Sequence, residues 1–225
     1  MCGRYALFSE KPVIEEHFGV ESDDDSLFVP NYNIAPGSVN PVVLVGKTRN
    51  RGIGALRWGL LPPWSKDPNM GYKLFNARSE TLDEKPSFKK AFERKRCVIP
   101  ANGFYEWKKL SDNKKMAFYI RLLNKEIFGF AGLFEKWTSP EGEDVFTYTI
   151  ITTEANELLQ PLHERMPVIL RPEQYEIWTD PMHAQTDTLK NLLRPYPTEE
   201  MSVFRVSDDV NSAKNNHAGL IQPTM

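Results

Sequence analysis

The clearest pattern along the chain is a series of short apolar runs between residues 97 and 152, separated by turn-forming residues. Their β-branched and aromatic content is typical of strands, and Ser111-Asp112-Asn113 and Pro140-Glu141-Gly142 mark two of the turns. The runs span residues 97–100, 103–107, 117–123, 127–133 and 145–152. Connections this short predict antiparallel pairing, because a parallel crossover needs a dozen or more residues.

Helical and further strand patterns flank this central region. Ser9 as a cap, Pro12 in the first turn and the spacing of Ile14 and Phe18 predict an early helix. Residues 86–96 carry Phe88, Ala91 and Phe92 on one face and predict an amphipathic helix with a basic outer side. Further helices are expected at 154–162, 172–178 and 186–193, and strands at 41–46, 56–61 and 203–206.

These elements predict an α+β protein with an antiparallel, barrel-like β core and peripheral helices. We expect one domain over residues 1–225, in which the polar C-terminal tail docks through Leu220 and Ile221. The apolar runs are too short for a transmembrane helix, and no signal peptide is visible. With Cys2 and Cys97 as its two cysteines, the chain has no disulfide framework, which favours a reducing cytoplasm.

The net charge of −2 does not by itself indicate a nucleic-acid-binding protein, so any such site must depend on local charge. Arg4, Arg78 and Lys214 are candidates for holding phosphates, and Trp64, which follows Pro62-Pro63, is a candidate stacking platform for bases. The basic side of residues 86–96 is more typical of a solvated helix face. No His and Cys spacing fits a metal site.

Cys2 is the position with the most distinctive chemistry. If Met1 is removed, the new terminus carries an α-amine and a thiol two carbons apart, and both groups are partly in their nucleophilic forms near neutral pH. Such a 1,2-aminothiol condenses with an aldehyde, first to an imine and then to a five-membered thiazolidine. The alternative is that Cys2 is an unremarkable second residue, and the position alone favours that alternative.

Three polar residues in apolar surroundings could serve this chemistry. Glu106, between Tyr105 and Trp107, would have a raised pKa if it is buried and could then transfer a proton, although strand alternation could equally turn it to solvent. His163 can exchange a proton near neutrality, but a surface histidine beside Glu164 is the alternative. Asn76 begins Asn76-Ala77-Arg78, which would place Asn76 and Arg78 on one side if extended, but the motif alone favours an Asn-led turn with a surface salt bridge from Arg78 to Glu80.

Taken together, the motifs resemble those of the SRAP family, the SOS-response-associated peptidase or abasic-site processing proteins. The resemblance covers nearly the whole chain, and six motifs in the same order make chance agreement improbable. The matching segments are MCGR (1–4), NYNIAPG (31–37), RWGLLPPW (57–64), NARSE (76–80), FYEW (104–107), HERMP (163–167) and the tail at 210–223. Tyr5, where Phe is common, is a mild departure.

The resemblance implies a protein of the SOS response to DNA damage that binds single-stranded DNA and traps the ring-opened aldehyde of an abasic site. By motif match, Cys2 would be the nucleophile, Asn76 would hold Cys2 and the sugar, Glu106 would accept the proton of the α-amine, and His163 would assist ring opening. The implied DNA-binding residues are Arg4, Asn33, Trp64, Arg78 and Thr152. The family is also described as removing its own initiator Met. We expect a monomer that acts on abasic single-stranded DNA in the cytoplasm, without membrane or cofactor.

Two other functions are compatible with the residues. One is a cysteine peptidase that acts on other proteins, with Cys2, His163 and Glu106 as its catalytic set. The other is a noncovalent reader of modified DNA. The position of the cysteine distinguishes them, because a peptidase nucleophile gains nothing from being residue two, whereas an aminothiol must be terminal.

Overall fold

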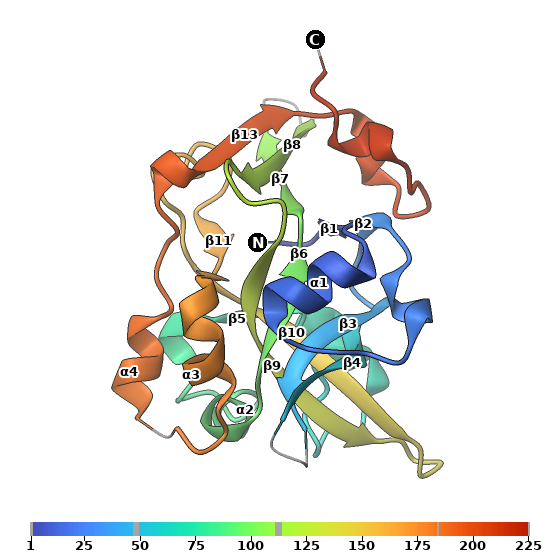
Figure 1. The fold of residues 1–225 in the computed structure, drawn as a ribbon, viewed down its shortest axis with the longest axis vertical. Coiled ribbons are helices and arrows are strands. Elements are labelled where there is room, and N and C mark those ends of the chain that lie inside the picture. The colour runs from blue at the N-terminus through green and yellow to red at the C-terminus, as the bar shows by residue number, and fades with distance from the viewer. Residues whose placement is uncertain (1, 47–49, 111–113, 184, 225) are drawn as a thin grey trace.

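The computed structural model describes residues 2–46, 50–110, 114–183 and 185–224, and a closed ring of five strands forms its core (Figure 1). Around the ring each strand hydrogen-bonds to the next, from β3 through β4, β10, β9 and β6 back to β3. The strands are β3 (Val39–Val45), β4 (Arg51–Trp58), β6 (Arg96–Ala101), β9 (Phe128–Thr138) and β10 (Asp144–Glu154). The predicted α+β class with a barrel-like core is confirmed, while Met1 and the predicted turn at 111–113 lie outside the described residues.

A second, five-stranded sheet lies above the barrel in Figure 1 and is antiparallel throughout. Its order is β13 (Met201–Arg205), β8 (Lys115–Leu122), β7 (Gly103–Lys109), β1 (Tyr5–Leu7) and β2 (Asn31–Ile34). The chain passes from β6 of the barrel to β7 of this sheet at Asn102, whose buried carboxamide accepts hydrogen bonds from the backbone of Phe8 and Ser9. This corner joins the amino-terminal segment to both layers.

The pairing of β10 corrects one expectation. β10 runs parallel to β4 and to the short strand β5 (Asn76–Arg78), whereas it is antiparallel to β9 and to β11 (Arg165–Pro167). The antiparallel prediction rested on short connections between consecutive strands, and consecutive pairs such as β9 and β10 follow it. A long stretch of chain separates β4 from β10, so no hairpin constrains their direction. The remaining strand, β12 (Ile169–Leu170), pairs with β9.

The helices are short and peripheral, as predicted. They are α1 (Lys11–Phe18), α2 (Lys89–Arg94), α3 (Tyr175–Thr179) and α4 (Thr186–Asn191). Single 3₁₀ turns span Asp25–Phe28, Pro68–Lys73, Ser79–Thr81, Pro172–Gln174, Thr198–Glu200, Asp208–Asn211 and Ala218–Ile221. Ser9 does not cap α1, because its hydroxyl accepts a hydrogen bond from Asn102 instead. Leu220 in the last of these turns is buried, so the tail docks as expected.

The helix expected at 154–162 is wrong. β10 continues through Glu154, and residues 157–162 form turns. Pro161 has no N–H to donate to a helical ladder, and the Asn156 side chain donates to the Tyr196 carbonyl. The apolar spacing that suggested a helix instead buries Leu159 against the core.

Arg96 was expected to end the basic face of a helix, but it begins β6 and is almost completely buried. Its guanidinium donates hydrogen bonds to five backbone carbonyls, those of Phe92, Glu93, Trp178, Asp180 and His183. These carbonyls belong to the carboxyl ends of α2 and α3 and the turn that follows α3, where helices leave acceptors unpaired. Arg96 therefore joins α2 and α3 to the barrel.

Replacing Arg96 with Met should lower the free energy of unfolding by about 3–5 kcal/mol, because five backbone carbonyls, two of them in buried hydrogen bonds, would lose their donor. The matched control is Arg94→Met, which removes an exposed guanidinium two residues away and should change stability by less than about 0.5 kcal/mol. Urea unfolding of both variants measures the difference. Equal effects would contradict the structural role of Arg96.

Candidate active site

The position of Cys2 is fixed by Tyr5, three residues further along the chain. Tyr5 is fully buried, and its ring packs edge-on against Trp58 with 5.2 Å between the centroids. Its hydroxyl shares a 2.8 Å hydrogen bond with the Tyr148 hydroxyl, which also accepts from the Asn40 side chain. Because these partners belong to β3, β4 and β10, the amino-terminal strand is anchored to the barrel.

The pairing of β1 with β7 brings Cys2 near Glu106. Tyr5 lies opposite Phe104, and the antiparallel ladder extends toward the amino terminus through a 3.0 Å hydrogen bond from the Tyr105 N–H to the Arg4 carbonyl. Continued by one residue, this register places Gly3 opposite Glu106. Cys2 is completely buried, burial raises the pKa of its thiol, and the nearby charge of Glu106 adds to the rise.

Asn76 holds the main chain of Cys2 from the opposite side of the site. Its Nδ2 donates a 2.7 Å hydrogen bond to the Cys2 carbonyl. Its Oδ1 is buried and has no hydrogen-bond partner among the described residues. A buried amide oxygen without a partner is rare in folded proteins and calls for a structural or functional explanation. Asn76 owes its position to β5, which pairs with the centre of β10.

Glu106 is buried, with 3% of its surface exposed, so strand alternation does not turn it to solvent. Burial raises the pKa of its carboxyl group from 4.5 to about 7, because the ionised form loses hydration in the protein interior. At neutral pH the carboxyl group can therefore both accept and donate a proton.

His163 lies in the turn between β10 and β11 and lines the same pocket as Glu106. Its Nδ1 accepts a 2.9 Å hydrogen bond from the Arg165 N–H, so the neutral ring carries its proton on Nε2. Burial lowers its pKa below 6.5, which keeps the ring neutral at physiological pH. A neutral imidazole with this tautomer can donate a hydrogen bond from Nε2 to a ligand oxygen in the pocket.

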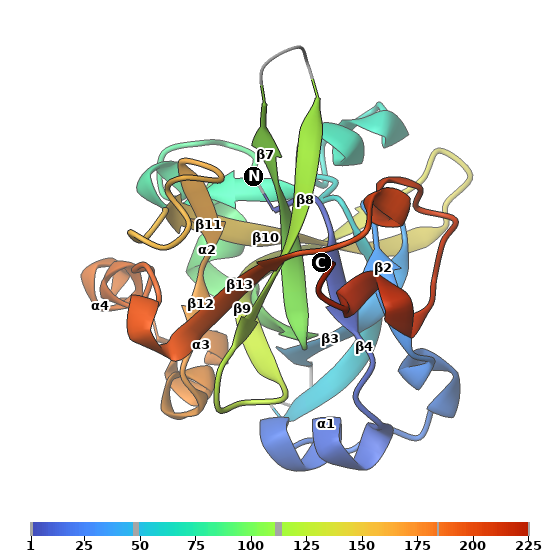
Figure 2. The same cartoon turned by 90° about the horizontal axis from the view of Figure 1, so that it is seen from above.

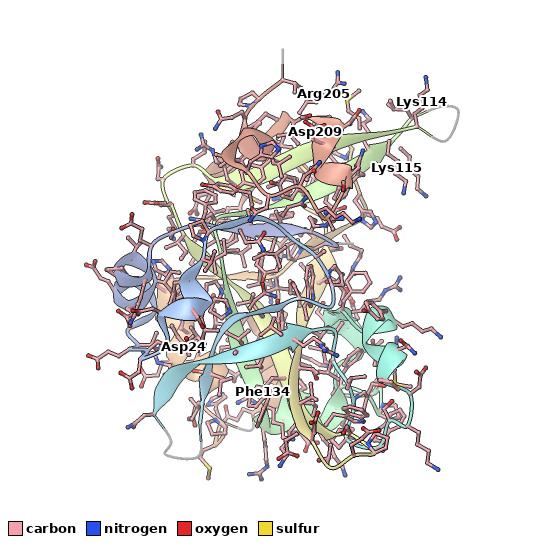
Figure 3. The ribbon with its side chains drawn as sticks, turned by 90° about the vertical axis from the view of Figure 1, so that its right-hand side faces the viewer. Asp24, Lys114, Lys115, Phe134, Arg205 and Asp209 are labelled. Carbon is pink, nitrogen blue, oxygen red and sulfur yellow. The ribbon has the colours of Figure 1, made fainter. Side chains whose placement is uncertain are left out.

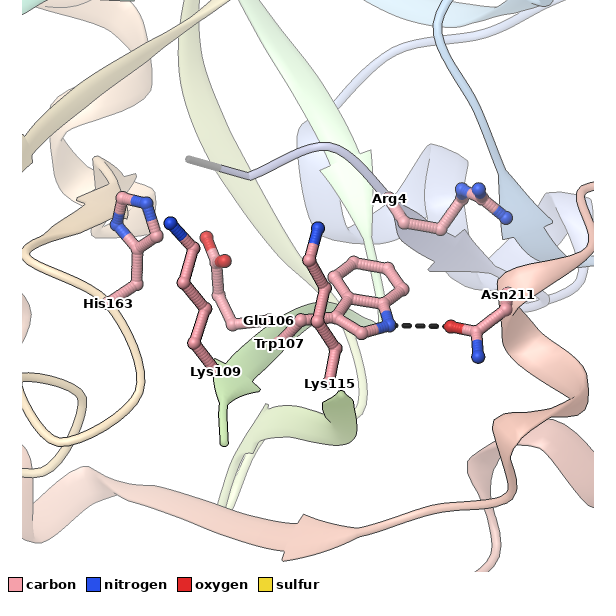
Figure 4. A pocket seen from close by; sticks show the side chains of 7 residues that line it. All are labelled: Arg4, Glu106, Trp107, Lys109, Lys115, His163 and Asn211. Carbon is pink, nitrogen blue, oxygen red and sulfur yellow. Dashed lines mark hydrogen bonds between the residues drawn. The ribbon is translucent and has the colours of Figure 1, made fainter. Parts of the chain in front are cut away.

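The pocket has a volume of about 540 Å³ and is open to solvent on one side. Figure 4 shows His163 at one end, Glu106 and Trp107 in the centre, and Arg4 and Asn211 at the other end. The indole Nε1 of Trp107 donates a 2.7 Å hydrogen bond to Asn211 Oδ1. Sequence reasoning gave neither of these two residues a role, and it also missed Lys109 and Lys115, which complete the lining.

Two of the predicted DNA-binding residues, Arg4 and Asn33, form one buried junction. Arg4 donates to the Asn33 side chain at 2.6 Å and to the Val210 carbonyl at 3.0 Å. Asn33 in turn donates to the carbonyls of Val210, Ser212 and Asn215 and is only 3% exposed. The described contacts of Asn33 thus fasten the C-terminal tail to the sheet, whereas Arg4 also reaches the pocket.

The other three predicted DNA-binding residues do not line this pocket. Trp64 is 57% exposed and lies on the loop after β4. Arg78 is exposed at the end of β5, two residues beyond Asn76. Thr152 is fully buried, and its hydroxyl donates to the Ala77 carbonyl at 3.4 Å, so its contact in the structure is internal.

Arg165 supports His163 and was not singled out by the sequence. Its guanidinium forms a bidentate ion pair with Glu80, with distances of 2.7 and 2.9 Å, and donates to the Thr152 carbonyl at 2.6 Å. These bonds fix the turn that presents His163. One indication of this role was present in the sequence, which is that Glu80 lies in the NARSE motif and Arg165 in the HERMP motif.

In the part of the chain that the structure describes, no cluster of three or more His, Cys, Asp or Glu side chains could hold a metal ion. Within the same residues, no helix is long and apolar enough to span a bilayer.

Comparison with known proteins identifies the family. The model of the SOS response associated peptidase (SRAP) family matches residues 1–213. The abasic site processing protein YoqW of Bacillus subtilis is 48% identical over 223 residues, which cover 99% of each chain. The abasic site processing protein HMCES of Xenopus tropicalis is 33% identical over 223 residues, covering 86% of this chain and 66% of its own. A crystal structure of a protein from Bacteroides thetaiotaomicron matches with a TM-score of 0.90, 27% identity and complete coverage of both chains. The chain belongs to the SRAP family, as its motifs predicted.

Proposed function

We propose that this protein processes abasic sites in single-stranded DNA by capturing their aldehyde on Cys2 after Met1 has been removed. The observation that carries the proposal is the hydrogen bond from Asn76 to the Cys2 carbonyl, beside the buried carboxyl group of Glu106. This contact holds residue two, rather than any other cysteine, next to an acid–base group. The names of YoqW and HMCES as abasic site processing proteins support the same function.

The chemistry requires several proton transfers that the site can serve. The abasic sugar is mostly a closed hemiacetal, and His163, with its proton on Nε2, is placed to assist ring opening. The α-amine of Cys2 then attacks the aldehyde carbon. Glu106 accepts the two amine protons in turn and passes them to the former carbonyl oxygen, which leaves as water, so that an imine forms. Finally the Cys2 sulfur adds to the imine carbon while its proton goes to the nitrogen, which closes the thiazolidine.

The burial of the thiol fits this order of events. Because burial raises the pKa of the Cys2 thiol, the sulfur stays protonated until the imine has formed. Once the ring is closed, the carbon is no longer an imine and cannot drive β-elimination of the strand. The protein would therefore shield the abasic site rather than cleave the DNA.

The geometry is less favourable for a peptidase that acts on other proteins. Such an enzyme needs a thiolate activated by imidazole. Among the described residues, the hydrogen bond of the Cys2 thiol goes to the Arg4 carbonyl, at 3.9 Å, and not to His163. We propose hydrolysis of the Met1–Cys2 bond as the peptidase activity of this chain. We also propose that the protein acts on DNA as a monomer in the cytoplasm.

Wild-type protein mixed with a uracil-containing single-stranded oligonucleotide and uracil glycosylase should give a band shift that survives boiling in SDS. Cys2→Ala should abolish this band and keep weak noncovalent binding, because both nucleophilic atoms act together only in a terminal cysteine. Cys97→Ala is the matched control, since it removes the other buried cysteine, and should crosslink normally. An uncleavable amino-terminal tag should block the reaction, and intact-mass measurement reports whether Met1 is absent. A noncovalent reader would give no boiled band, and normal crosslinking by the tagged protein would refute the role of the α-amine.

Glu106→Gln should lower the crosslinking rate by about 10²–10⁴-fold, because the amide cannot take a proton from the α-amine. In the wild type the rate should fall as the pH drops below about 7, where Glu106 becomes protonated. The variant should retain only the pH dependence of the amine itself. Glu141→Gln, an exposed change in the turn between β9 and β10, is the control and should leave the profile unchanged. Identical pH profiles for the wild type and Glu106→Gln would assign the titration to another group.

The raised pKa of Glu106 also has a signature in stability. The carboxyl group ionises near 4.5 when unfolded and near 7 when folded, so its contribution is fully present at low pH and is lost as the pH rises toward 7. Between about pH 4 and pH 8 the wild type should lose about 3 kcal/mol relative to Glu106→Gln. Urea unfolding of both proteins across this range measures the difference. A constant difference would show that Glu106 is not desolvated in the folded protein.

A further inference from the structure

The β7–β8 hairpin extends beyond the rest of the sheet and carries four lysines near its tip (Figures 2 and 3). They are Lys108, Lys109, Lys114 and Lys115, and all four are exposed. The register of the hairpin places Lys109 directly opposite Lys115. Two like charges at facing positions of an antiparallel pair destabilise a hairpin, so this pairing calls for an explanation other than strand formation.

No described carboxylate compensates this repulsion. The ion pairs of the described residues include neither Lys109 nor Lys115, although Glu106 lines the same pocket. Elsewhere in the described chain, lysines such as Lys95 and Lys136 do form ion pairs. Lys109 and Lys115 are therefore available to an external anion.

These two lysines face the candidate active site, whereas their neighbours do not line it. Lys109 and Lys115 line the pocket together with Glu106 and His163, and Figure 4 shows both side chains extending from the hairpin into it. Lys108 and Lys114 are each one residue away in sequence, and successive strand residues point to opposite faces. One face of the hairpin, with Lys109 and Lys115, therefore lines the pocket, whereas Lys108 and Lys114 do not.

The charges around the pocket favour an anion. Arg4, Lys109 and Lys115 are cationic, and Glu106 is the carboxyl group in the lining, with a pKa raised to about 7 by burial. Burial is also the main cause that lowers the pKa of His163, and the positive charge of Lys109 contributes. Glu164 opposes this effect. Arg4 is half-buried and its Nη1 already donates to Asn33 and Val210, so the two lysines are the exposed cations of the lining.

We propose that Lys109 and Lys115 form a phosphate-binding subsite of the active site, which takes a backbone phosphate flanking the reacting sugar. The inference rests on the proposed function, because it assumes that a DNA strand enters the pocket. An ammonium group is a compact charge that binds phosphate without fixed geometry, and a phosphodiester placed between two of them would replace their repulsion with two attractions. The hairpin would then act as the wall that positions the strand over Cys2.

The test uses single-stranded oligonucleotides that carry a tetrahydrofuran abasic analogue, which binds but cannot form an imine. The variant K109Q/K115Q should bind about 10-fold more weakly at 0.1 M salt. Its plot of log affinity against log salt should be shallower by about 0.7 for each phosphate that the variant no longer neutralises. The matched control K108Q/K114Q removes the same charge from the same hairpin and should change the slope less. The variant K109R/K115R keeps the charge and should keep the wild-type slope.

A second set of oligonucleotides locates the phosphate. Each carries one uncharged methylphosphonate linkage at a defined position near the tetrahydrofuran. At one flanking position the neutral linkage should weaken binding by the wild type and leave K109Q/K115Q unaffected. If every position weakens both proteins equally, the lysines act only through the general field of the molecule and the subsite is refuted.

The outcomes separate this proposal from the proposed function. Crosslinking by the wild type together with no methylphosphonate coupling would refute the subsite and leave aldehyde capture standing. Coupling without any crosslinking would refute capture and leave a noncovalent phosphate site. Removal of the like-charge pair should leave K109Q/K115Q at least as stable as the wild type in urea unfolding, whereas a loss of stability would assign the two lysines a structural role instead.

Discussion

The anchoring of Tyr5 inside the barrel is the contact on which the position of the amino terminus depends. A chain terminus is ordinarily the least ordered part of a domain unless it is tied down. Here the Tyr5 ring packs between Trp58 and Phe130, and its hydroxyl reaches Tyr148. Three residues upstream, Cys2 has little freedom to move away. Cys2 is therefore held in place like a residue of the protein interior, although it lies next to the amino terminus.

The register between β1 and β7 then sets where Glu106 lies relative to the anchored amino-terminal segment. Because β1 and β7 are antiparallel, a shift of one residue would move Glu106 to the opposite face of β7, away from the amino-terminal segment. The same burial that fixes Glu106 also raises its pKa toward neutrality, since a carboxylate is poorly solvated there. Burial therefore determines both the position and the raised pKa of the Glu106 carboxyl group. The unpartnered Oδ1 of Asn76 is a second polar group whose burial makes sense when a ligand is bound.

Local sequence patterns were sufficient for most elements, whereas the candidate roles of Cys2, Asn76, Glu106 and His163 came from the family resemblance. The strands between 97 and 152 follow from apolar runs and turn residues, whereas the local patterns around Glu106 and His163 left a solvent-facing placement open for each. The failures have tertiary causes. The parallel pairing of β4 with β10 joins strands that are far apart in sequence, and the guanidinium of Arg96 is buried by helix ends that no local pattern reveals.

Two roles at the site were also invisible to local reasoning. Asn33 was expected along the DNA path, yet its described hydrogen bonds hold the tail at Val210, Ser212 and Asn215, a contact between segments far apart in the chain. Lys109 and Lys115 read as ordinary surface lysines until the hairpin register places them opposite each other. In the proposed function, the buried reactive groups and the exposed lysines act over different distances. The groups proposed to make and break bonds are buried, which excludes water from them. A charged DNA strand would lose hydration free energy if it entered such a buried site. On the proposed function, the exposed lysines would attract phosphates that stay partly hydrated at the rim, while the uncharged aldehyde alone would reach Cys2.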